Sequence, residues 1–362
     1  MVQSSDYVEL ARVWRGPVVE STHRGAVVVA GLSGGLRNAW GNHGLVTTPR
    51  SALKPFQAVA LVESGAADAF GLSEEHIALA CASHHAQPFQ VALVTDWLGR
   101  LGLDEGALVC GPALPKGTED MAAAFAQGGP RRVFHNCSGK HCGFLTVARH
   151  LGAGLDYADR AHPAQRLYMD ILSEYTGRDA AALPAGVDNC GLPAIALPMV
   201  DMARACARLA AGAGRTEARR AAAQRVMKAM AAHPDHLAGT DEPTARIIRA
   251  TGGKVVLKGG AEGFVAGFAR ELGFGIAVKI ADGATRGKMG TLVRILCKLG
   301  ALSRDEAEAL METVEPPVTD SNGNVIGGVE VPFERPVPTT PTRATPGFWF
   351  SGVPVLEDVF KP

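Results

Sequence analysis

A serine and a lysine lie three residues apart in Ser51-Ala52-Leu53-Lys54, and Pro55 follows directly. Three residues are about one helical turn, so on a helix the hydroxyl and the amine share a face. Pro55 is tolerated only near the start of a helix, because it lacks an N–H and clashes with the preceding turn. A helix is therefore predicted to begin near Ser51, with the hydroxyl at the positive end of the helix dipole. A lysine held there can take the serine proton and make the serine a nucleophile.

The Ser-x-x-Lys spacing is weak evidence on its own, because two common residues recur at this distance by chance. A helix-capping role for Ser51 and a solvated Lys54 are the simpler alternatives. Two later features strengthen the catalytic interpretation: Ser83 follows an apolar run, and Lys258 ends a β-branched stretch that continues into Gly259-Gly260. The order Ser-x-x-Lys, internal serine, Lys-x-Gly is that of serine β-lactamases and penicillin-binding proteins. All three features in this order favour catalysis.

Lys54 needs a lowered pKa to act as a base. A free lysine has a pKa of about 10.4, whereas an efficient base titrates nearer about 7–8. Burial and a second nearby amine both lower the pKa of a lysine. We expect Lys258 to be that second amine.

A second constellation packs two histidines, two cysteines and a lysine into the eight residues His135–Cys142, and Cys190 lies downstream. Thiolates suit zinc. The Cys-x4-Cys spacing, however, departs from zinc fingers and from zinc deaminases. From spacing alone two interpretations stay open. One is a metal site anchored by a distant segment such as Cys190, and the other is a set of buried polar residues with satisfied partners.

Composition narrows the class of protein. The 362 residues carry 36 Lys and Arg against 36 Asp and Glu, and the chain has no basic stripe, which argues against nucleic acid as a partner. No apolar run reaches membrane-spanning length, and the first residues lack the basic-then-apolar order of a signal peptide. Seven cysteines without regular spacing are expected to be core residues or metal ligands in a reducing compartment. We therefore expect a cytoplasmic protein.

The hydrophobic pattern changes twice along the chain. Period-two, β-branched stretches occur at both ends, and alanine-rich helical patterns fill the middle. This order predicts an α+β fold, in which strands from the two ends form one antiparallel sheet and a helical region is inserted between them. The expected strands are Tyr7–Trp14, Val18–Thr22, Ala26–Ala30, Lys254–Lys258, Gly263–Ala269 and Phe274–Ile280, and the expected helices include Met202–Gly212, Glu217–Ala232 and Lys288–Leu302. We expect a single catalytic domain over residues 1–334, with the helical insertion at about 74–250, and a Pro/Thr-rich tail over 335–362.

Five segments together resemble a known family, the rhizobial-type (class 3) L-asparaginases of the asparaginase II family. They are SALKPFQA from Ser51, ACASHHAQP from Ala80, HNCSGKHCGF from His135, VDNCGLPA from Val187 and KGGAEG from Lys258. The resemblance extends from about residue 8 to residue 290. It implies a serine β-lactamase-like fold, hydrolysis of L-asparagine to L-aspartate and ammonia, and a homodimer.

Carried over residue by residue, the resemblance implies two Ser-Lys pairs, Ser51 with Lys54 and Ser83 with Lys258. In this scheme Ser51 attacks and Lys54 is the base. The resemblance also implies a zinc site whose ligands are Cys137, Lys140 and Cys190. A lysine ligand must be neutral, which burial and the charge of the metal favour. Such a site is expected to hold the wall of the substrate pocket rather than to activate water.

Four further residues are expected to bind substrate. Arg50 suits an α-carboxylate, because its guanidinium can make two parallel hydrogen bonds. Asp188 and His141 fall within the shared motifs and are expected at the substrate ammonium or behind a metal ligand. Glu63 lies on the predicted Ser51 helix, about three turns further on.

The sequence also departs from the family pattern. Ala86-Gln87 stand where many relatives carry glycine and glutamate, and Thr244 stands where relatives often carry cysteine. The nucleophiles are intact, but substrate preference and turnover stay open, and one methylene separates asparagine from glutamine by only about 1–3 kcal/mol. Two other functions remain: a serine acylase of β-lactams or D-amino peptides, which the missing signal peptide argues against, and a catalytically silent, zinc-containing amino-acid sensor.

Overall fold

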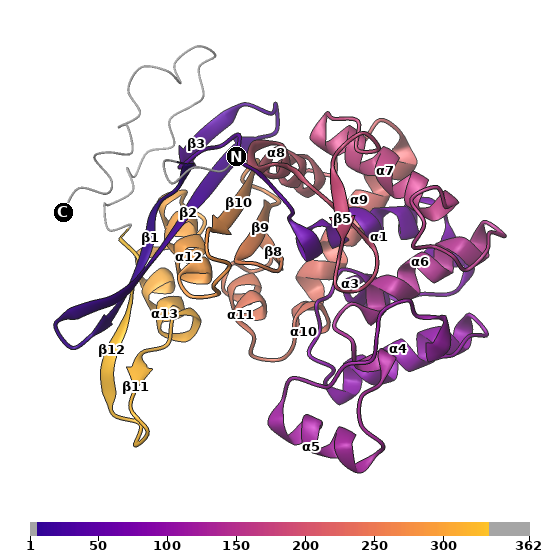
Figure 1. Ribbon diagram of the computed structural model, residues 1–362. Helices are drawn as coiled ribbons and strands as arrows, with labels where there is room; N and C mark the ends of the chain where they lie inside the picture. Colours follow the sequence, from indigo (N-terminus) through magenta and orange to yellow (C-terminus); the bar gives the residue numbers. More distant parts are fainter. Residues whose placement is uncertain (1–5, 333–362) are drawn as a thin grey trace.

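The computed structural model describes residues 6–332 (Figure 1). Strands from both ends of the chain form one eight-stranded sheet in the order β11-β12-β1-β2-β10-β9-β8, and β3 pairs with β2. The strand pairs are antiparallel. The strands are β1 (Val8–Arg15), β2 (Val18–Gly31), β3 (Leu36–Trp40), β8 (Val255–Gly259), β9 (Phe264–Ala269), β10 (Phe274–Ile280), β11 (Val318–Thr319) and β12 (Val325–Glu330).

Helices occupy the middle of the chain and lie together on one side of the sheet in Figure 1. They are α1 (Lys54–Glu63), α2 (Ala66–Ala69), α3 (Glu74–Ala80), α4 (Pro88–Arg100), α5 (Thr118–Ala126), α6 (Ser138–His150), α7 (Pro163–Thr176), α8 (Met199–Ala210), α9 (Glu217–Ala232), α10 (Pro234–Leu237) and α11 (Pro243–Ala250). Short 3₁₀ helices η2 (Arg50–Leu53), η3 (Glu105–Ala107) and η4 (Arg132–Phe134) and short strands β4 (Val46–Thr47), β5 (Ala185–Val187), β6 (Pro193–Ile195) and β7 (Leu197–Pro198) join them. The chain returns to the sheet and adds α12 (Lys288–Lys298) and α13 (Arg304–Val314).

The predicted fold class is confirmed: the protein is α+β, and both ends of the chain build its antiparallel sheet around an inserted helical region. Three details of the prediction were wrong. Two predicted N-terminal strands are one long strand, β2, because its pairing with β1 continues through the residues between them. The β11–β12 hairpin and α13 were not predicted. The tail predicted over 335–362 lies outside the described residues.

Both faces of the central strands are covered. Every residue of β9 is buried, as are Ala26–Gly31 of β2, which explains why these segments read as continuous apolar runs rather than as alternating patterns. Helix α8 packs against β2, β9 and β10, and α12 packs against β9 and β10. The approach of α8 is close: a Cβ on Gly275 would lie 2.2 Å from the carbonyl oxygen of Ala203. Glycine therefore permits this contact.

Helix α1 is the core of the helical region. It packs against α6, α7 and α9, and most of its side chains are buried. The ring of Phe56 lies 5.6 Å from that of Tyr175 and 6.1 Å from that of Phe268, so α1 joins the helices to the sheet. A helix buried on nearly all sides is held rigidly by packing. The residues at its N-terminal end therefore have a fixed position.

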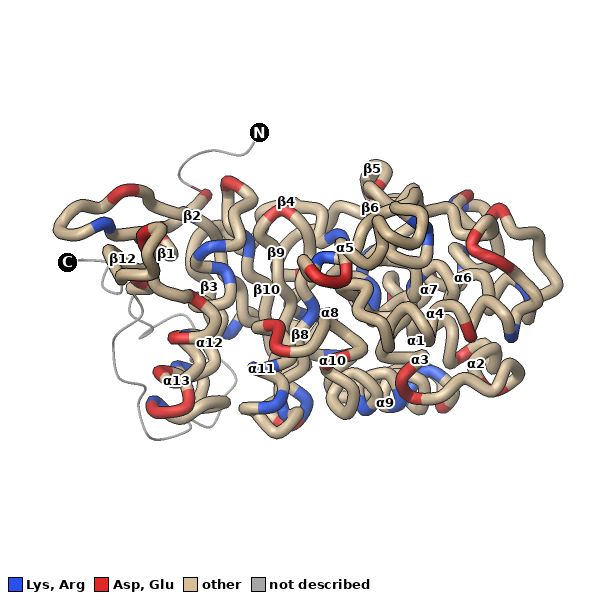
Figure 2. The backbone as a smooth tube through the Cα atoms, turned by 90° about the horizontal axis from the view of Figure 1, so that it is seen from below, with Lys and Arg blue, Asp and Glu red and all other residues tan. Residues whose placement is uncertain are grey.

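Charged residues of both signs are interspersed along the backbone in Figure 2, in agreement with the formal net charge of zero. None of the helices between residues 6 and 332 combines the length and the apolar character needed to cross a bilayer.

Candidate active site

The end of strand β8 is packed against the start of the Ser51 helix. Ser51 lies in η2, and Lys54 begins α1 directly afterwards, which confirms the predicted helix start. The turn after Lys258 reaches this point because a Cβ on Gly260 would lie 2.2 Å from the carbonyl oxygen of Pro49. Only glycine allows so close an approach between two backbones. The chain thus brings two segments together that are about two hundred residues apart.

Two lysines donate hydrogen bonds to one serine. The Nζ of Lys54 lies 3.1 Å from the Oγ of Ser83 and also donates to the carbonyl of Ala82. The Nζ of Lys258 lies 2.7 Å from the same Oγ and 2.8 Å from the carbonyl oxygen of Gly259. The exposed fractions of Lys54 and Lys258 are 1% and 3%. The structure therefore forms a continuous chain from amine to hydroxyl to amine.

Burial sets the electrostatics of this chain. It is the main cause of a lowered pKa of Lys54, and the nearby Lys140 lowers the pKa further. Burial also holds the pKa of Lys258 well below its ordinary value, with the charge of Lys54 as the next cause. The charge of Lys54 thus favours the neutral form of Lys258. The second amine that lowers the pKa of Lys54 is Lys140, whereas the sequence indicated Lys258. A neutral lysine can accept a proton, which is what a general base must do.

The segment that carries Ser83 is anchored from two helices. Helix α3 ends at Ala80, and the N–H of Ser83 then donates to the carbonyl of Leu237 in α10 at 3.2 Å. The N–H of His84 donates to the carbonyl of Asn136 at 3.2 Å, just before α6. These bonds hold the segment between α6 and α10.

The Ser51 hydroxyl faces a cavity. It makes no hydrogen bond to any other residue between 6 and 332, and it is partly exposed. The sequence paired Ser51 with Lys54, whereas the hydrogen bonds of Lys54 pair it with Ser83. The cavity measures about 310 Å³. Its lining residues are Arg50, Ser51, His84, His85, Ala113, Leu114, Lys116, Phe134, His135, Asn136, Cys137, Asp188, Asn189, Cys190 and Ala261.

Arg50 and Asp188 form an ion pair on the wall of this cavity. The guanidinium Nη2 lies 2.5 Å from Oδ1 of Asp188 and 2.9 Å from Oδ1 of Asn189. The bond to Asp188 is the main cause of a raised pKa of Arg50. The Nε of Arg50 is buried without a partner in the described part of the chain. Arg50 also has a φ of +54°, a left-handed conformation that residues other than glycine seldom adopt. The pair therefore places one positive and one negative group on the cavity wall.

The family model described as L-asparaginase II matches residues 11–331. The chain belongs to the L-asparaginase II family.

Among solved structures, the chain is similar to Mglu in its glutamate form, with 16% identity over 78% of this chain and a TM-score of 0.46. The match spans 62% of the length of the Mglu chain. A β-lactamase from Mycobacterium bovis is similar over 76% of this chain and 94% of its own, with 12% identity and a TM-score of 0.41. A comparison with proteins of curated function gave no match.

The thiols expected to bind zinc in this L-asparaginase II family member lie together. The Nζ of Lys140 donates to the Sγ of Cys190 at 2.8 Å. A hydrogen bond from Cys190 is the main cause that holds the pKa of Cys137 well below its ordinary value, and the same bond raises the pKa of Cys190. Burial alone would lower the pKa of Lys140. The sulfur groups of Cys137 and Cys190 favour its ammonium form more strongly, so the pKa of Lys140 is raised. The three groups thus form one buried, polar cluster.

These residues fit a zinc ion only with the lysine as a ligand. Between residues 6 and 332 no group of three or more His, Cys, Asp or Glu side chains lies in metal-binding positions. Two thiolates and one amine are an acceptable donor set, and a thiolate and a nitrogen on one tetrahedral zinc lie about 3.5 Å apart. The observed 2.8 Å between Lys140 and Cys190 would therefore open by less than 1 Å. Binding would release the protons of Lys140 and Cys190.

Two predicted substrate-binding residues lie away from the cavity lining. The Nδ1 of His141 on α6 is 2.9 Å from the hydroxyl of Tyr157, and its Nε2 is buried without a partner in residues 6–332. Glu63 was predicted to bind substrate, but it does not line the cavity. It lies at the far end of α1, roughly 18 Å along the helix from Ser51, and makes a bidentate ion pair with Arg219 at 2.9 and 3.0 Å.

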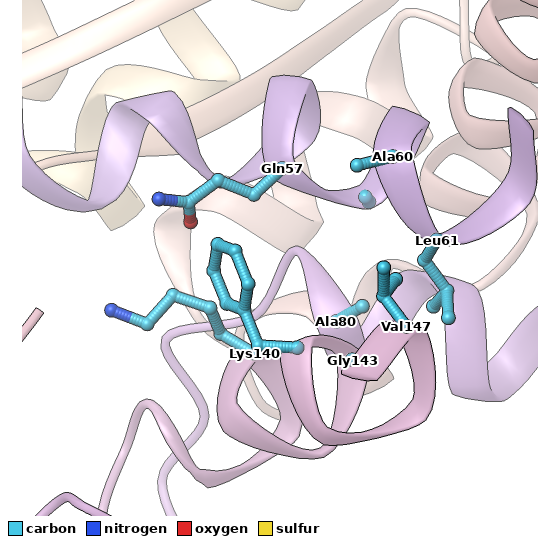
Figure 3. A pocket seen from close by; sticks show the side chains of 9 residues that line it. Gln57, Ala60, Leu61, Ala80, Lys140, Gly143 and Val147 are labelled. Atoms are coloured by element: carbon cyan, nitrogen blue, oxygen red, sulfur yellow. The ribbon is translucent and has the colours of Figure 1, made fainter. Parts of the chain in front are cut away.

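A second, much smaller cavity lies between α1 and α6 (Figure 3). It measures about 10 Å³, enough for about one water molecule. Gln57 and Lys140 extend toward the same side of it in Figure 3, and its other walls are mostly apolar. This space is too small for an amino acid, so the larger cavity is the candidate substrate site.

Several lining residues were not predicted from the sequence. His84, Asn136 and Asn189 lie inside motifs that were identified, and their position beside Ser83, Cys137 and Asp188 was the available signal. Lys116 lies in a loop without any motif, and no feature of the sequence indicates its place at the cavity.

Proposed function

We propose that this chain hydrolyses the side-chain amide of L-asparagine to L-aspartate and ammonia, with Ser51 as the nucleophile. The family supports amide hydrolysis. The observation that carries the proposal is the chain of hydrogen bonds from Lys54 through Ser83 to Lys258, beside a cavity lined by Ser51. Two buried amines on one hydroxyl are a means of moving a proton, and neither a helix cap nor a solvated lysine requires them.

Arg50 and Asp188 would bind the two charged groups of an α-amino acid. The carboxylate of the substrate would pair with the guanidinium of Arg50, and the ammonium would pair with the carboxylate of Asp188. Each residue then exchanges one ionic partner for another, so neither charge is left buried without a partner. This arrangement favours zwitterionic amino acids over simple amides.

The chemistry would proceed by acyl transfer. Neutral Lys54 accepts the proton of Ser51 as the hydroxyl oxygen attacks the amide carbon. Backbone N–H groups at the start of η2 stabilise the oxyanion, at about 3 kcal/mol per donor in known hydrolases. The proton passes through Ser83 and Lys258 to the departing nitrogen, and the carbon–nitrogen bond breaks to give ammonia and an aspartyl ester. Water then hydrolyses the ester, which returns the proton to Ser51 and yields aspartate.

Cys137, Lys140 and Cys190 would hold a zinc ion. Bound there, zinc supplies a fixed positive charge that ties the Cys190 segment, with its neighbour Asp188, to α6. The residues that move protons in the proposed reaction are Lys54, Ser83 and Lys258. The zinc site therefore serves substrate positioning in this proposal.

The test is ammonia release from asparagine and from glutamine by the wild type, Ser51→Ala and Lys54→Met. We expect each variant to lose activity by at least about a thousandfold. Ser64→Ala, a hydroxyl removed at the other end of the same helix, is the matched control and keeps wild-type turnover. Near wild-type rates in Ser51→Ala would overturn the assignment of the nucleophile. Asparagine binding without ammonia release indicates a sensor, and hydrolysis of nitrocefin instead of asparagine indicates a β-lactam acylase.

A further inference from the structure

A second group of charged side chains lies at the same cavity, outside the proposed machinery for asparagine. Lys116 and His85 both line the cavity. The Nζ of Lys116 lies 2.9 Å from the Nε2 of His85, and the Nδ1 of His85 lies 3.1 Å from Oε1 of Glu242. None of these three residues shares a hydrogen bond or an ion pair with Lys54, Ser83 or Lys258. Lys116 and His85, which line the cavity, have no role in the mechanism above.

The ammonium of Lys116 is held in position. Its backbone N–H donates to the carbonyl of His85 at 3.0 Å, in addition to the side-chain bond. His85 is fixed in turn, because its N–H donates to Oε1 of Gln90 at 3.1 Å and its ring faces Glu242. Since Lys116 donates to Nε2, the ring is neutral and its Nδ1–H donates to Glu242. Lys116 is therefore an oriented cation with two N–H groups left to donate.

Besides the Arg50–Asp188 pair, the cavity lining carries one charged side chain, the cation Lys116. Lys288 acts on Lys116, Glu242 and Glu315, but Lys288 and the two carboxylates do not line the cavity. Burial and the charge of Lys116 keep the imidazole of His85 neutral, with a pKa of about 4. This part of the cavity thus attracts an anion.

The cavity is also larger than asparagine requires. A buried cavity of about 150 Å³ holds benzene, which has six heavy atoms. By that scale 310 Å³ holds about twelve heavy atoms, and asparagine has nine. The remaining space suits three or four more atoms, about the size of a glycyl group.

The proposed mechanism places the leaving group on the side of the cavity that carries Lys116. In the proposed mechanism Arg50 and Asp188 bind the two charged groups of the aspartyl part, and the proton reaches the departing nitrogen through Ser83 and Lys258. Lys116 is bonded to His85, which is two residues beyond Ser83. A carboxylate attached to the departing nitrogen would therefore extend toward Lys116.

We propose that Lys116 forms a leaving-group subsite for a carboxylate, and that the chain hydrolyses β-aspartyl dipeptides as well as asparagine. This proposal rests on the proposed function. In the reaction the amide carbon–nitrogen bond breaks, water supplies the oxygen of the new aspartate carboxylate, and the nitrogen takes a proton to leave as the amine of a free amino acid. The subsite takes an amino acid with a free α-carboxylate, and glycine is the smallest of these.

The experiment compares kcat/KM for three substrates: asparagine, β-aspartylglycine and β-aspartylglycinamide. The last two have nearly the same size and differ in the carboxylate. We expect the wild type to prefer β-aspartylglycine over the glycinamide by about tenfold, the effect of one hydrogen bond to a charged group. Lys116→Met should reduce this ratio to about one, and Lys116→Arg should retain it. The preference should also shrink at high salt, because Lys116 is exposed.

The matched control is Lys228→Met. Lys228 is an exposed lysine on α9, ion-paired with Glu74, away from the cavity lining, and its substitution should leave all three rates unchanged. Equal wild-type rates on the two dipeptides, or an unchanged ratio in Lys116→Met, would overturn the subsite. An equal loss on asparagine and on β-aspartylglycine would also overturn it, because Lys116 would then serve the aspartyl part. Hydrolysis of asparagine without the dipeptide refutes the subsite alone, whereas no hydrolysis of asparagine refutes the proposed function.

Discussion

The amine of Lys258 lies 2.7 Å from the hydroxyl of Ser83, although 175 residues separate them along the chain. The contact depends on Gly260, which lets the end of β8 approach Pro49 and the start of the Ser51 helix. It also depends on the anchoring of the Ser83 segment to α10 and α6. This hydrogen bond thus joins a strand from the C-terminal half of the sheet to a segment of the inserted helical region, and both contribute to one site.

Replacing Lys258 by methionine separates catalysis from stability. The variant removes one end of the hydrogen-bonded chain, so we expect turnover of asparagine to fall by about 10²–10⁴-fold, the usual contribution of a positioned proton donor. The folded protein should be at least as stable as the wild type at neutral pH, because burial lowers the pKa of Lys258 and the charged amine opposes folding. Steady-state kinetics and urea unfolding measure the two effects.

Lys254→Met is the matched control, since Lys254 is exposed just before the other end of β8. It should keep both activity and stability. A Lys258→Met enzyme with wild-type turnover would exclude Lys258 from the proton path.

Asp188→Asn should weaken substrate binding more than it slows the chemical step. The variant leaves the ammonium of asparagine without its carboxylate partner, and a hydrogen bond to a charged group is worth about 1.5–3 kcal/mol. We therefore expect KM for asparagine to rise by about tenfold to a hundredfold, with a smaller change in kcat. Asp305→Asn, an exposed acid on α13, serves as the control and changes neither. A kcat effect larger than the KM effect would mean that Asp188 acts on the reacting groups.

Much of the fold could be predicted because the pattern was local. The hydrophobic pattern of a strand or a helix can be recognised within a single segment. The predicted bounds of two such segments, Phe274–Ile280 and Glu217–Ala232, match β10 and α9. The β11–β12 hairpin was missed because β11 has two residues and β12 contains two adjacent glycines, so neither shows a β-branched run. Its strands form through pairing with β1, which no local pattern reveals.

The candidate site was predictable only in part. The order of the serine and lysine motifs indicated which segments meet, but not that Lys54 bonds to Ser83 rather than to Ser51. Glu63 was misplaced because helical spacing shows which residues share a face of the helix but not how far apart they lie along its axis. Glu63 instead pairs with Arg219. Lys116 was missed because its place depends on a loop that packs against His85, a purely tertiary contact.

Ala86→Gly should stabilise the protein. Ala86 has a φ of +59°, in the left-handed region where a Cβ costs about 1–2 kcal/mol. Glycine removes that strain, although it loses some chain entropy and one buried methyl, so we expect a net gain of about 0.5–1 kcal/mol. Thermal or urea unfolding at neutral pH measures it. Ala123→Gly, at an exposed position within α5, should destabilise by about 1 kcal/mol. A destabilised Ala86→Gly protein would show that packing of the methyl outweighs the strain.

His84 should make stability fall as the pH falls. Its Nδ1 accepts from the N–H of Ala86 and its Nε2 faces Ser138 at 2.7 Å, so the buried ring is neutral. Burial lowers the pKa of His84 to about 3, whereas an unfolded histidine titrates near 6.5. Between these values the unfolded chain binds more protons, so its free energy of unfolding decreases on acidification.

The loss attributable to His84 between pH 6 and pH 4 is about 2.5 kcal/mol. Urea unfolding over this range measures it against His84→Asn, which keeps an acceptor for the N–H of Ala86 but cannot titrate. The variant should be less stable at pH 7 and show a shallower dependence on pH. Parallel pH profiles for the two proteins would show that His84 is not the titrating group.

The proposed zinc site predicts about one ion per chain in the wild type, and Cys190→Ala should lower this content toward zero. The variant removes one of two thiolates from a set in which the third ligand is an amine, and a single thiolate with Lys140 gives too few protein ligands for a structural site. Elemental analysis of protein prepared without chelators measures the content. Cys206→Ala removes a buried thiol on α8 and should keep the metal. The loss should also raise KM for asparagine, because Asp188 is two residues from Cys190 and the wall of the cavity that it forms would no longer be tied to α6. Zinc-free wild-type protein with full activity would remove the metal from the proposal and leave Cys137, Lys140 and Cys190 as a hydrogen-bonded cluster that supports the cavity by itself.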